Sequence, residues 1–192
     1  TSNLQNPTHT YINCGSYTVT LTVTDDNDCE TIETINVTVY ELPTAAFGPN
    51  TTTSICYDLV SGSCIQIEDA STYNNNSSCI GSPIDSWEVI IRENWSPYNI
   101  VFGPTTYTSF PSPNICVPLT PPPNCGTNSN LIYNYEIELI VQDQNTCIND
   151  EQIITTVTCQ PIADFTPDDA CLNSPDDAEI FFNNTSSLYS TS

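Results

Sequence analysis

Eight residues near the amino terminus, Tyr17 to Thr24, alternate one large apolar side chain with one threonine. Successive side chains of a β-strand point to opposite faces, so the apolar residues share one face and the threonines the other. This pattern is typical of an antiparallel strand with one face buried and the other in water. Turn-forming residues at 25–28 interrupt the alternation, and Ile35, Val37 and Val39 resume it. The sequence therefore predicts a β-hairpin.

The hairpin pattern recurs at an offset of 118 residues (135 − 17), and a three-residue deletion later reduces the offset to 115. A period of this length exceeds the roughly 20–50 residues of a solenoid repeat and approaches the roughly 100 residues of a sandwich domain. We therefore predict tandem β-sandwich domains. Aligned pairs include Tyr17 with Tyr135, Leu21 with Leu139, Cys29 with Cys147, Phe47 with Phe165, and Cys56 with Cys171.

The positions at which the repeat begins and ends predict three domain segments. Residues 1–41 are expected to close one domain, residues 42–160 to form a complete domain, and residues 161–192 to open the next. On this interpretation the biological chain is longer at both ends. An enlarged region, Asn94 to Asn130, predicts an insertion or an extra hairpin in the middle domain.

Composition bears on compartment and partners. Ten cysteines without a zinc-type Cys-x-x-Cys pair favour disulfides and an oxidising location. Arg92 is the sole lysine or arginine, and the formal net charge is −22. Such a charge repels nucleic acid and anionic membranes, so we expect neither as a partner. No apolar run is long enough for a transmembrane helix, and we expect no membrane insertion in this segment.

The motifs "NPTHTY" (Asn6 to Tyr11) and "GSYTVTLTVTD" (Gly15 to Asp25) resemble the closing part of the polycystic-kidney-disease (PKD) domain. That family has an immunoglobulin-like β-sandwich fold, so the resemblance implies an all-β chain. "PTAAF", "PIADF" and "FFNNTSS" match its opening strands, and "IDSWEVII" resembles its Trp-bearing third strand, although the usual Gly-Asp-Gly turn is missing. Cys-containing PKD arrays are similar to those of large bacterial surface proteins, including gliding adhesins exported by the type IX route. PKD domains also occur as spacers in secreted proteases and polysaccharide hydrolases.

Few residues offer catalytic chemistry. His9 is the only histidine, so no Ser/His/Asp or Cys/His arrangement can be built around another one. We expect no enzyme activity and no catalytic or cofactor-binding residues. Asp25, Asp26 and Asp28 offer hard oxygen ligands for Ca²⁺, but they lack the spacing of an EF-hand, and solvated turn aspartates are the simpler interpretation. Trp87 is expected to be the buried tryptophan of the third strand.

The immunoglobulin-like fold that the resemblance implies suggests a cysteine framework. It brings Cys147 toward Cys56 and Cys159 toward Cys64, while Cys116 and Cys125 bracket a Pro-rich loop that they can close locally. Seven cysteines in the complete domain cannot all pair internally. Cys79, which is left over, is then free, linked to a neighbouring domain or bridged to another chain. The remaining cysteines, Cys14, Cys29 and Cys171, are expected to find partners outside the sequence.

These features predict a structural or adhesive segment of a long extracellular repeat fibre at a bacterial cell surface. The alternative is a PKD spacer of a secreted hydrolase, and a third class is a calcium- or glycan-binding module. Expected partners are other repeats of the same chain, a homo-oligomer or laterally associated fibre, and a cell-surface or glycan ligand of unknown identity. Aromatic residues are enriched at interfaces, although covering their own sandwich is an equally good use for them. The candidate contact residues in the enlarged region are Trp95, Tyr98, Phe102, Tyr107 and Phe110.

Overall fold

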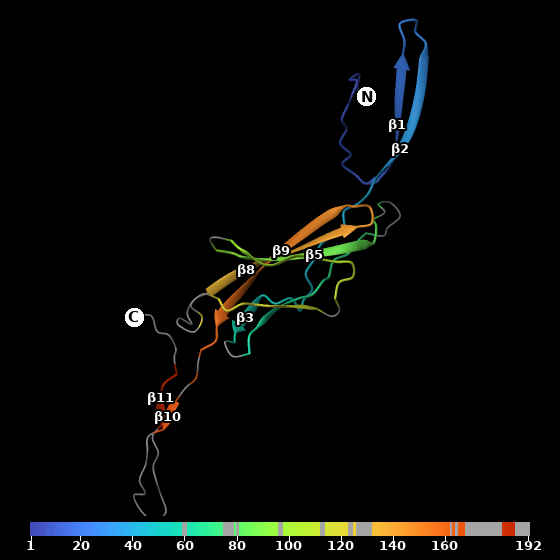
Figure 1. Ribbon diagram of the computed structural model, residues 1–192. Helices are drawn as coiled ribbons and strands as arrows, with labels where there is room; N and C mark the ends of the chain where they lie inside the picture. Colours follow the sequence, from blue (N-terminus) through green and yellow to red (C-terminus); the bar gives the residue numbers. More distant parts are fainter. Residues whose placement is uncertain are drawn as a thin grey trace, which may run out of the picture.

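The structure, a computed structural model, is built from β-strands, and its described residues contain no helix (Figure 1). It describes residues 1–58, 61–74, 79, 81–95, 98–111, 114–122, 125, 132–161, 163, 165–167 and 182–186. Within these residues no helix is long and apolar enough to cross a membrane. The strands are β1 (Gly15–Thr24), β2 (Glu30–Val39), β3 (Ser54–Tyr57), β4 (Cys64–Ile67), β5 (Ile84–Glu93), β6 (Ile100–Tyr107), β7 (Ile115–Pro118), β8 (Ile132–Asp143), β9 (Ile148–Cys159), β10 (Phe165–Pro167) and β11 (Phe182–Asn184).

Seven strands, β3 to β9, form a two-layered β-sandwich of the immunoglobulin-like type. One layer is a five-stranded sheet in the order β3-β9-β8-β5-β6, and the other contains the antiparallel pair β4-β7. All neighbours in the larger sheet are antiparallel except β3, which runs parallel to the second half of β9. The expected all-β sandwich is therefore confirmed.

The core lies between the two layers. The inward positions predicted on β8, Tyr135, Ile137, Leu139 and Val141, are all buried, with 2% exposure for the tyrosine and 0% for the aliphatic residues. The smaller sheet supplies the opposing wall. Trp87 is half-buried against this core, and its indole N–H donates to Asp69 Oδ2 at 2.9 Å. The opposing wall includes Ile65, Ile67, Ile115 and Val117.

The β1–β2 hairpin repeats the β8–β9 hairpin in register and in turn geometry. Val19 pairs with Ile35 as Ile137 pairs with Ile153. Each turn begins with an aspartate that accepts hydrogen bonds from two backbone N–H groups, and each contains one residue with φ near +64° (Asp28 at 63° and Thr146 at 65°). The sequence similarity between the two hairpins thus extends to their local geometry.

The two hairpins differ in what covers them. The apolar face of β8–β9 is covered by the second layer, whereas the same face of β1–β2 is open, with Leu21 61% and Val23 57% exposed. In Figure 1, β1–β2 lies beyond one end of the sandwich and the β10–β11 pair beyond the other.

The enlarged region at 94–130 contributes two strands to the sandwich. β6 forms an edge of the five-stranded sheet by pairing with β5, and β7 pairs with β4 in the other layer. Gly103, at φ +80°, lies in β6 at the irregularity in its antiparallel pairing with β5, and a Cβ at this position would be 2.2 Å from the carbonyl oxygen of Val89. Only glycine permits this close approach of the two backbones.

Candidate functional surfaces and the disulfide framework

Three disulfides join elements that are distant in sequence. They are Cys14–Cys79, Cys64–Cys116 and Cys125–Cys159, with Cα–Cα distances of 5.4, 5.5 and 5.5 Å. Three cysteines of the described part of the chain, Cys29, Cys56 and Cys147, are free thiols. Cys171 lies outside the described residues.

The disulfide pairing expected from the sequence is wrong. Cys56 does not approach Cys147, because β3 runs along the second half of β9 and places Cys56 opposite Thr158, at the far end of the sheet from the β8–β9 turn. Cys64 pairs with Cys116 because β4 and β7 are neighbours, with Gln66 opposite Cys116.

Cys125 forms no local bond with Cys116, and it binds Cys159 at the end of β9 instead. The expectation that Cys14 finds its partner outside the sequence is also wrong, since it binds Cys79. Residues 42–160 contain an odd number of cysteines, so at least one of them cannot pair within this segment. That count was the signal in the sequence for a bond to a neighbouring domain. The partner itself could not be identified from spacing.

The Cys14–Cys79 bond crosses the junction between the β1–β2 hairpin and the sandwich. Beside it, the Asn74 side-chain amide donates to the Glu41 carboxylate at 2.5 Å. Sulfur and carboxylate atoms of Cys14, Cys79 and Glu41 lie within 4.8 Å of one another, but both sulfurs are held in the disulfide. A shallow cleft of about 480 Å³ opens here between residues 11–14, residues 39–44 and Asn149. The junction is thus held by a peptide connection, a disulfide and a side-chain hydrogen bond.

The candidate calcium ligands lie in the β1–β2 turn. Asp25 Oδ1 accepts the backbone N–H groups of Asn27 and Cys29 at 2.8 and 2.9 Å. These bonds from Cys29 and Asn27 hold the pKa of Asp25 below its ordinary value of 3.8. Among the described residues, the three aspartates do not gather into a group with ligand atoms within 4.8 Å of one another. Asp25 therefore serves as a turn cap, and Asp26 and Asp28 lie exposed beside it.

In the matching turn of the sandwich, the capping aspartate is buried while Gln144 and Thr146 are exposed. Asp143, 2% exposed, accepts the N–H groups of Asn145 and Cys147 at 2.8 and 2.9 Å. Burial raises the pKa of the Cys147 thiol, and the neighbouring Asp143 charge raises it further. Cys147 is therefore held as a protonated, weakly nucleophilic thiol.

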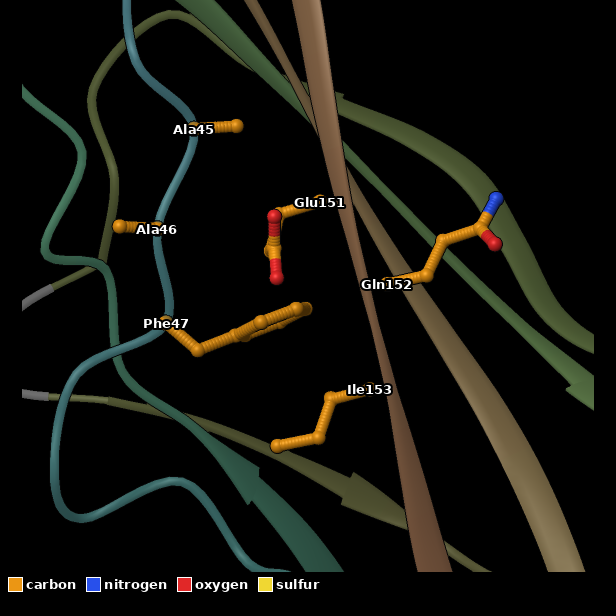
Figure 2. A pocket seen from close by; sticks show the side chains of 6 residues that line it. All are labelled: Ala45, Ala46, Phe47, Glu151, Gln152 and Ile153. Carbon is orange, nitrogen blue, oxygen red and sulfur yellow. The ribbon is translucent and has the colours of Figure 1, made fainter.

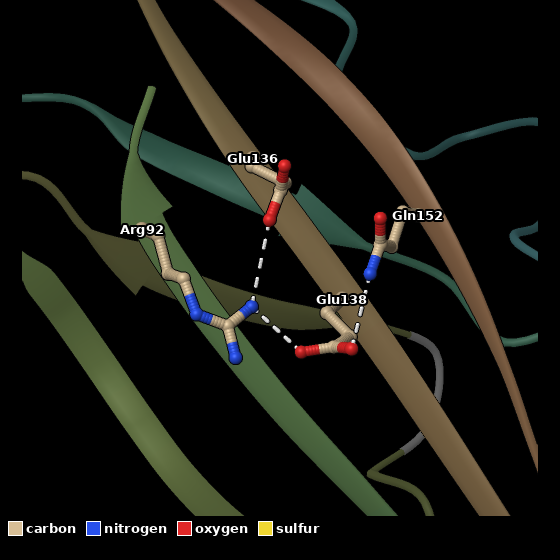
Figure 3. Close-up of polar contacts among 4 residues, drawn as sticks. All are labelled: Arg92, Glu136, Glu138 and Gln152. Atoms are coloured by element: carbon tan, nitrogen blue, oxygen red, sulfur yellow. Dashed lines mark hydrogen bonds and ion pairs between the residues drawn. The ribbon is translucent and has the colours of Figure 1, made fainter. Parts of the chain in front are cut away.

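The single arginine of the chain organises the outer face of the five-stranded sheet (Figure 3). Arg92 Nη1, from β5, lies 2.6 Å from Glu138 Oε2 and 3.5 Å from Glu136 Oε1, both on β8. The Gln152 side-chain amide, from β9, donates to Glu138 Oε1 at 3.1 Å. The network joins three neighbouring strands and neutralises part of a strongly acidic face.

A pocket of about 410 Å³ lies where residues 45–47 pass β9 (Figure 2). Ala45, Ala46 and Phe47 form one side, and Glu151 and Ile153 point toward them from β9, while Gln152 points away. The lining carries one carboxylate and no second titratable group. This arrangement offers no acid–base pair or nucleophile–base pair.

Four of the five candidate contact aromatics pack on the sandwich itself. Trp95 stacks edge-on against Tyr133 and Tyr135, with ring centroids 5.3 and 5.1 Å apart. These four side chains are partly buried against their own core, whereas Tyr98 is 63% exposed. The packed aromatics are Trp95, Phe102, Tyr107 and Phe110.

Comparison with known proteins connects the amino-terminal hairpin with a family. No curated protein matches the chain at a significant level. A family model described as the PKD domain matches residues 1–39, the segment in which His9, Tyr11 and Tyr17 stack with ring centroids 4.7 and 4.3 Å apart. PKD domains are generally extracellular adhesion or structural domains and are typically non-catalytic, and disulfides fit that oxidising setting. The match is confined to residues 1–39 and shows that this segment is similar to the PKD domain, and the immunoglobulin-like sandwich that follows is of the same all-β fold class.

Proposed function

We propose that this chain is a non-enzymatic structural and adhesive segment of a long extracellular fibre of PKD-type units at a bacterial cell surface. The observation that carries the proposal is the pair of hairpins with the same register and the same aspartate-capped turn, 118 residues apart. A chain that repeats one sandwich hairpin at this spacing is organised as a tandem array of sandwich domains. We assign residues 1–41 to the end of one unit, 42–160 to a complete unit and 161–192 to the start of the next.

The exposed face of β1–β2 supports this organisation. An isolated two-stranded hairpin is marginally stable in water. On β8–β9, the neighbouring strands and the second layer bury the residues that correspond to Leu21 and Val23. The rest of the unit that residues 1–41 are proposed to close would bury Leu21 and Val23 in the same way.

The chemistry of the surface supports a structural role. The pocket beside β9 contains a lone carboxylate, and His9 packs on Tyr11 at the edge of the hairpin. Disulfides, a short Pro-containing junction at 41–43 and an acidic surface suit a stiff, soluble spacer in an oxidising environment. We further propose export by the type IX route, on the resemblance of the sequence to Cys-containing PKD arrays of gliding-type adhesins.

Electron microscopy of the natural polypeptide tests this proposal. An antibody raised against residues 42–160 would locate the protein on cells, and rotary shadowing of the purified polypeptide would show its shape. We expect a long, thin fibre with a regular bead spacing. A compact catalytic particle with a short stalk would contradict the fibre and favour the spacer of a secreted hydrolase.

Lateral association is a separate part of the proposal. At a net charge of −22, fibres repel one another unless salt or Ca²⁺ screens them over a Debye length of about 8–10 Å. We expect the mass of purified three-unit segments in solution to rise with added salt or Ca²⁺. A strict monomer under every condition would leave a single-stranded stalk.

A further inference from the structure

We propose that the three disulfides form a continuous covalent path that carries tension through the sandwich and around its five-stranded sheet. Tension applied at the amino terminus enters the sandwich through Cys14–Cys79, because Cys14 precedes β1 in the chain and Cys79 belongs to the sandwich segment. From Cys79 the path returns to Cys64, crosses to Cys116, continues to Cys125 and crosses to Cys159. It leaves the sandwich at the end of β9.

The path is much shorter than the polypeptide that it bridges. It uses the segments 64–79 and 116–125, about 24 residue steps that span at most roughly 85 Å at 3.3–3.6 Å per residue. Three disulfide crossings of 5.4, 5.5 and 5.5 Å between Cα atoms complete it. The peptide route from Cys14 to Cys159 has about 145 steps and a fully extended length of about 500 Å.

The strands outside the path are the ones that form the larger sheet. β3, β5, β6 and β8 contain no residue of the path, and β9 meets it only at its last residue, Cys159. The path includes most of β4 and β7, which pair with each other and are joined by Cys64–Cys116. Tension along the chain therefore acts on the smaller layer, and the five-stranded sheet is not required to transmit it.

The path also runs from one end of the sandwich to the other. Cys79 is bonded to Cys14 at the junction between the β1–β2 hairpin and the sandwich. Cys159 lies opposite Tyr57, at the end of β9 away from the β8–β9 turn. Figure 1 shows the hairpin and the β10–β11 pair beyond these opposite ends. This inference rests on the proposed function for its biological use, since a fibre under tension benefits from a short covalent path. The path itself depends only on the disulfide connectivity.

Single-molecule stretching of the full 192-residue chain from its two ends tests the path. With disulfides intact and free thiols blocked, we expect no extension step that releases the whole sandwich. Reduction should lengthen the fully extended chain by about 121 residues, or roughly 420 Å. A reduction-sensitive release that is absent from the oxidised chain supports the path, and full release from a chain whose disulfides are shown intact by mass spectrometry overturns it.

Variants identify each crossing by a distinct length. The double variant C14S/C79S should gain about 35 residues, roughly 120 Å, and C64S/C116S about 22 residues, roughly 75 Å. These gains are expected whether or not the variant folds, because they depend on covalent connectivity. The matched control is C56S, which removes a thiol that belongs to no disulfide and should leave the extension unchanged.

Unchanged extension in C14S/C79S would overturn the path at its first crossing. That result would leave the proposed fibre untouched, because the fibre is tested by its shape on cells. A catalytic particle in electron microscopy would, in turn, contradict the fibre without changing the measured extensions.

Discussion

Leu139 and Leu21 occupy the same position in two hairpins, but their surroundings differ. Leu139 pairs with Glu151 and is 0% exposed, whereas Leu21 pairs with Glu33 and is 61% exposed. Truncating a buried leucine removes transfer free energy and leaves a cavity. Leu139→Ala should therefore lower the free energy of unfolding of the sandwich by about 2–5 kcal/mol.

Tryptophan fluorescence during urea unfolding measures this change, since Trp87 and Trp95 both lie in the sandwich. Leu21→Ala is the matched control, and its effect should stay within about 0.5 kcal/mol, as for surface substitutions. Equal losses in the two variants would show that the sandwich does not bury Leu139 as the structure describes.

Asp25 connects turn geometry to pH. Its folded-state pKa lies below 3.8 because its carboxylate accepts backbone hydrogen bonds from Cys29 and Asn27. A depressed pKa contributes stability that is present above the unfolded-state pKa and is lost as the pH falls through the folded-state pKa. Carbon-detected NMR should show Asp25 titrating below pH 3.8, with the amide signals of Asn27 and Cys29 shifting in the same transition.

Asp25→Asn is the control for this titration. An amide oxygen can still accept the two hydrogen bonds, but it does not titrate in this range. The acid-induced shift of the two amide signals should therefore disappear in the variant. An ordinary or raised pKa for Asp25 would contradict the capped turn.

At the level of elements, the long alternating strands could be predicted from the sequence, but their long-range partners could not. The inward residues of β8 follow directly from the period-two pattern, since side-chain direction alternates along any strand. The destinations of β6 and β7 depend on the chain path between Asn94 and Asn130, where no periodicity fixes the register. The pairing expected for Cys116 and Cys125 failed for the same reason, because both lie in that region.

Gly103 is the position on which the β5–β6 pairing depends. Gly103→Ala adds a Cβ that would lie 2.2 Å from the Val89 carbonyl oxygen, at a φ of +80° that alanine rarely adopts. The backbone conformation alone costs about 1–2 kcal/mol, and the contact with Val89 adds to that cost. We expect G103A to destabilise the sandwich by more than this and to increase hydrogen exchange along β6.

Gly62→Ala isolates the backbone contribution. Gly62 has a similar φ of +74°, but no atom lies within 4 Å of a Cβ placed there. Its loss should be about 1–2 kcal/mol, without a selective effect on β6. The same loss in both variants would show that β6 does not approach Val89 closely.

For the whole molecule, the joint between the hairpin and the sandwich decides whether consecutive units bend. The peptide connection at 41–43 contains one proline, and proline restricts only its own φ and the backbone conformation of the residue before it. Cys14–Cys79 adds a second covalent attachment, and the Asn74–Glu41 hydrogen bond a third contact. Two attachments remove most relative rotations of the two bodies, so the joint should be stiff only in oxidised protein.

The free thiols provide the measurement of this stiffness. Cys29 lies at the tip of the hairpin and Cys56 on the sandwich, and both are exposed, so spin labels can be attached without new cysteines. In a C147S background, which keeps the label off the half-buried third thiol, pulsed electron spin resonance should give a narrow Cys29–Cys56 distance distribution. Adding C14S/C79S removes one attachment without adding a thiol, so the distribution should broaden. Equal widths would mean that the peptide connection and the hydrogen bond hold the joint, and the disulfide would then transmit tension without setting the bend.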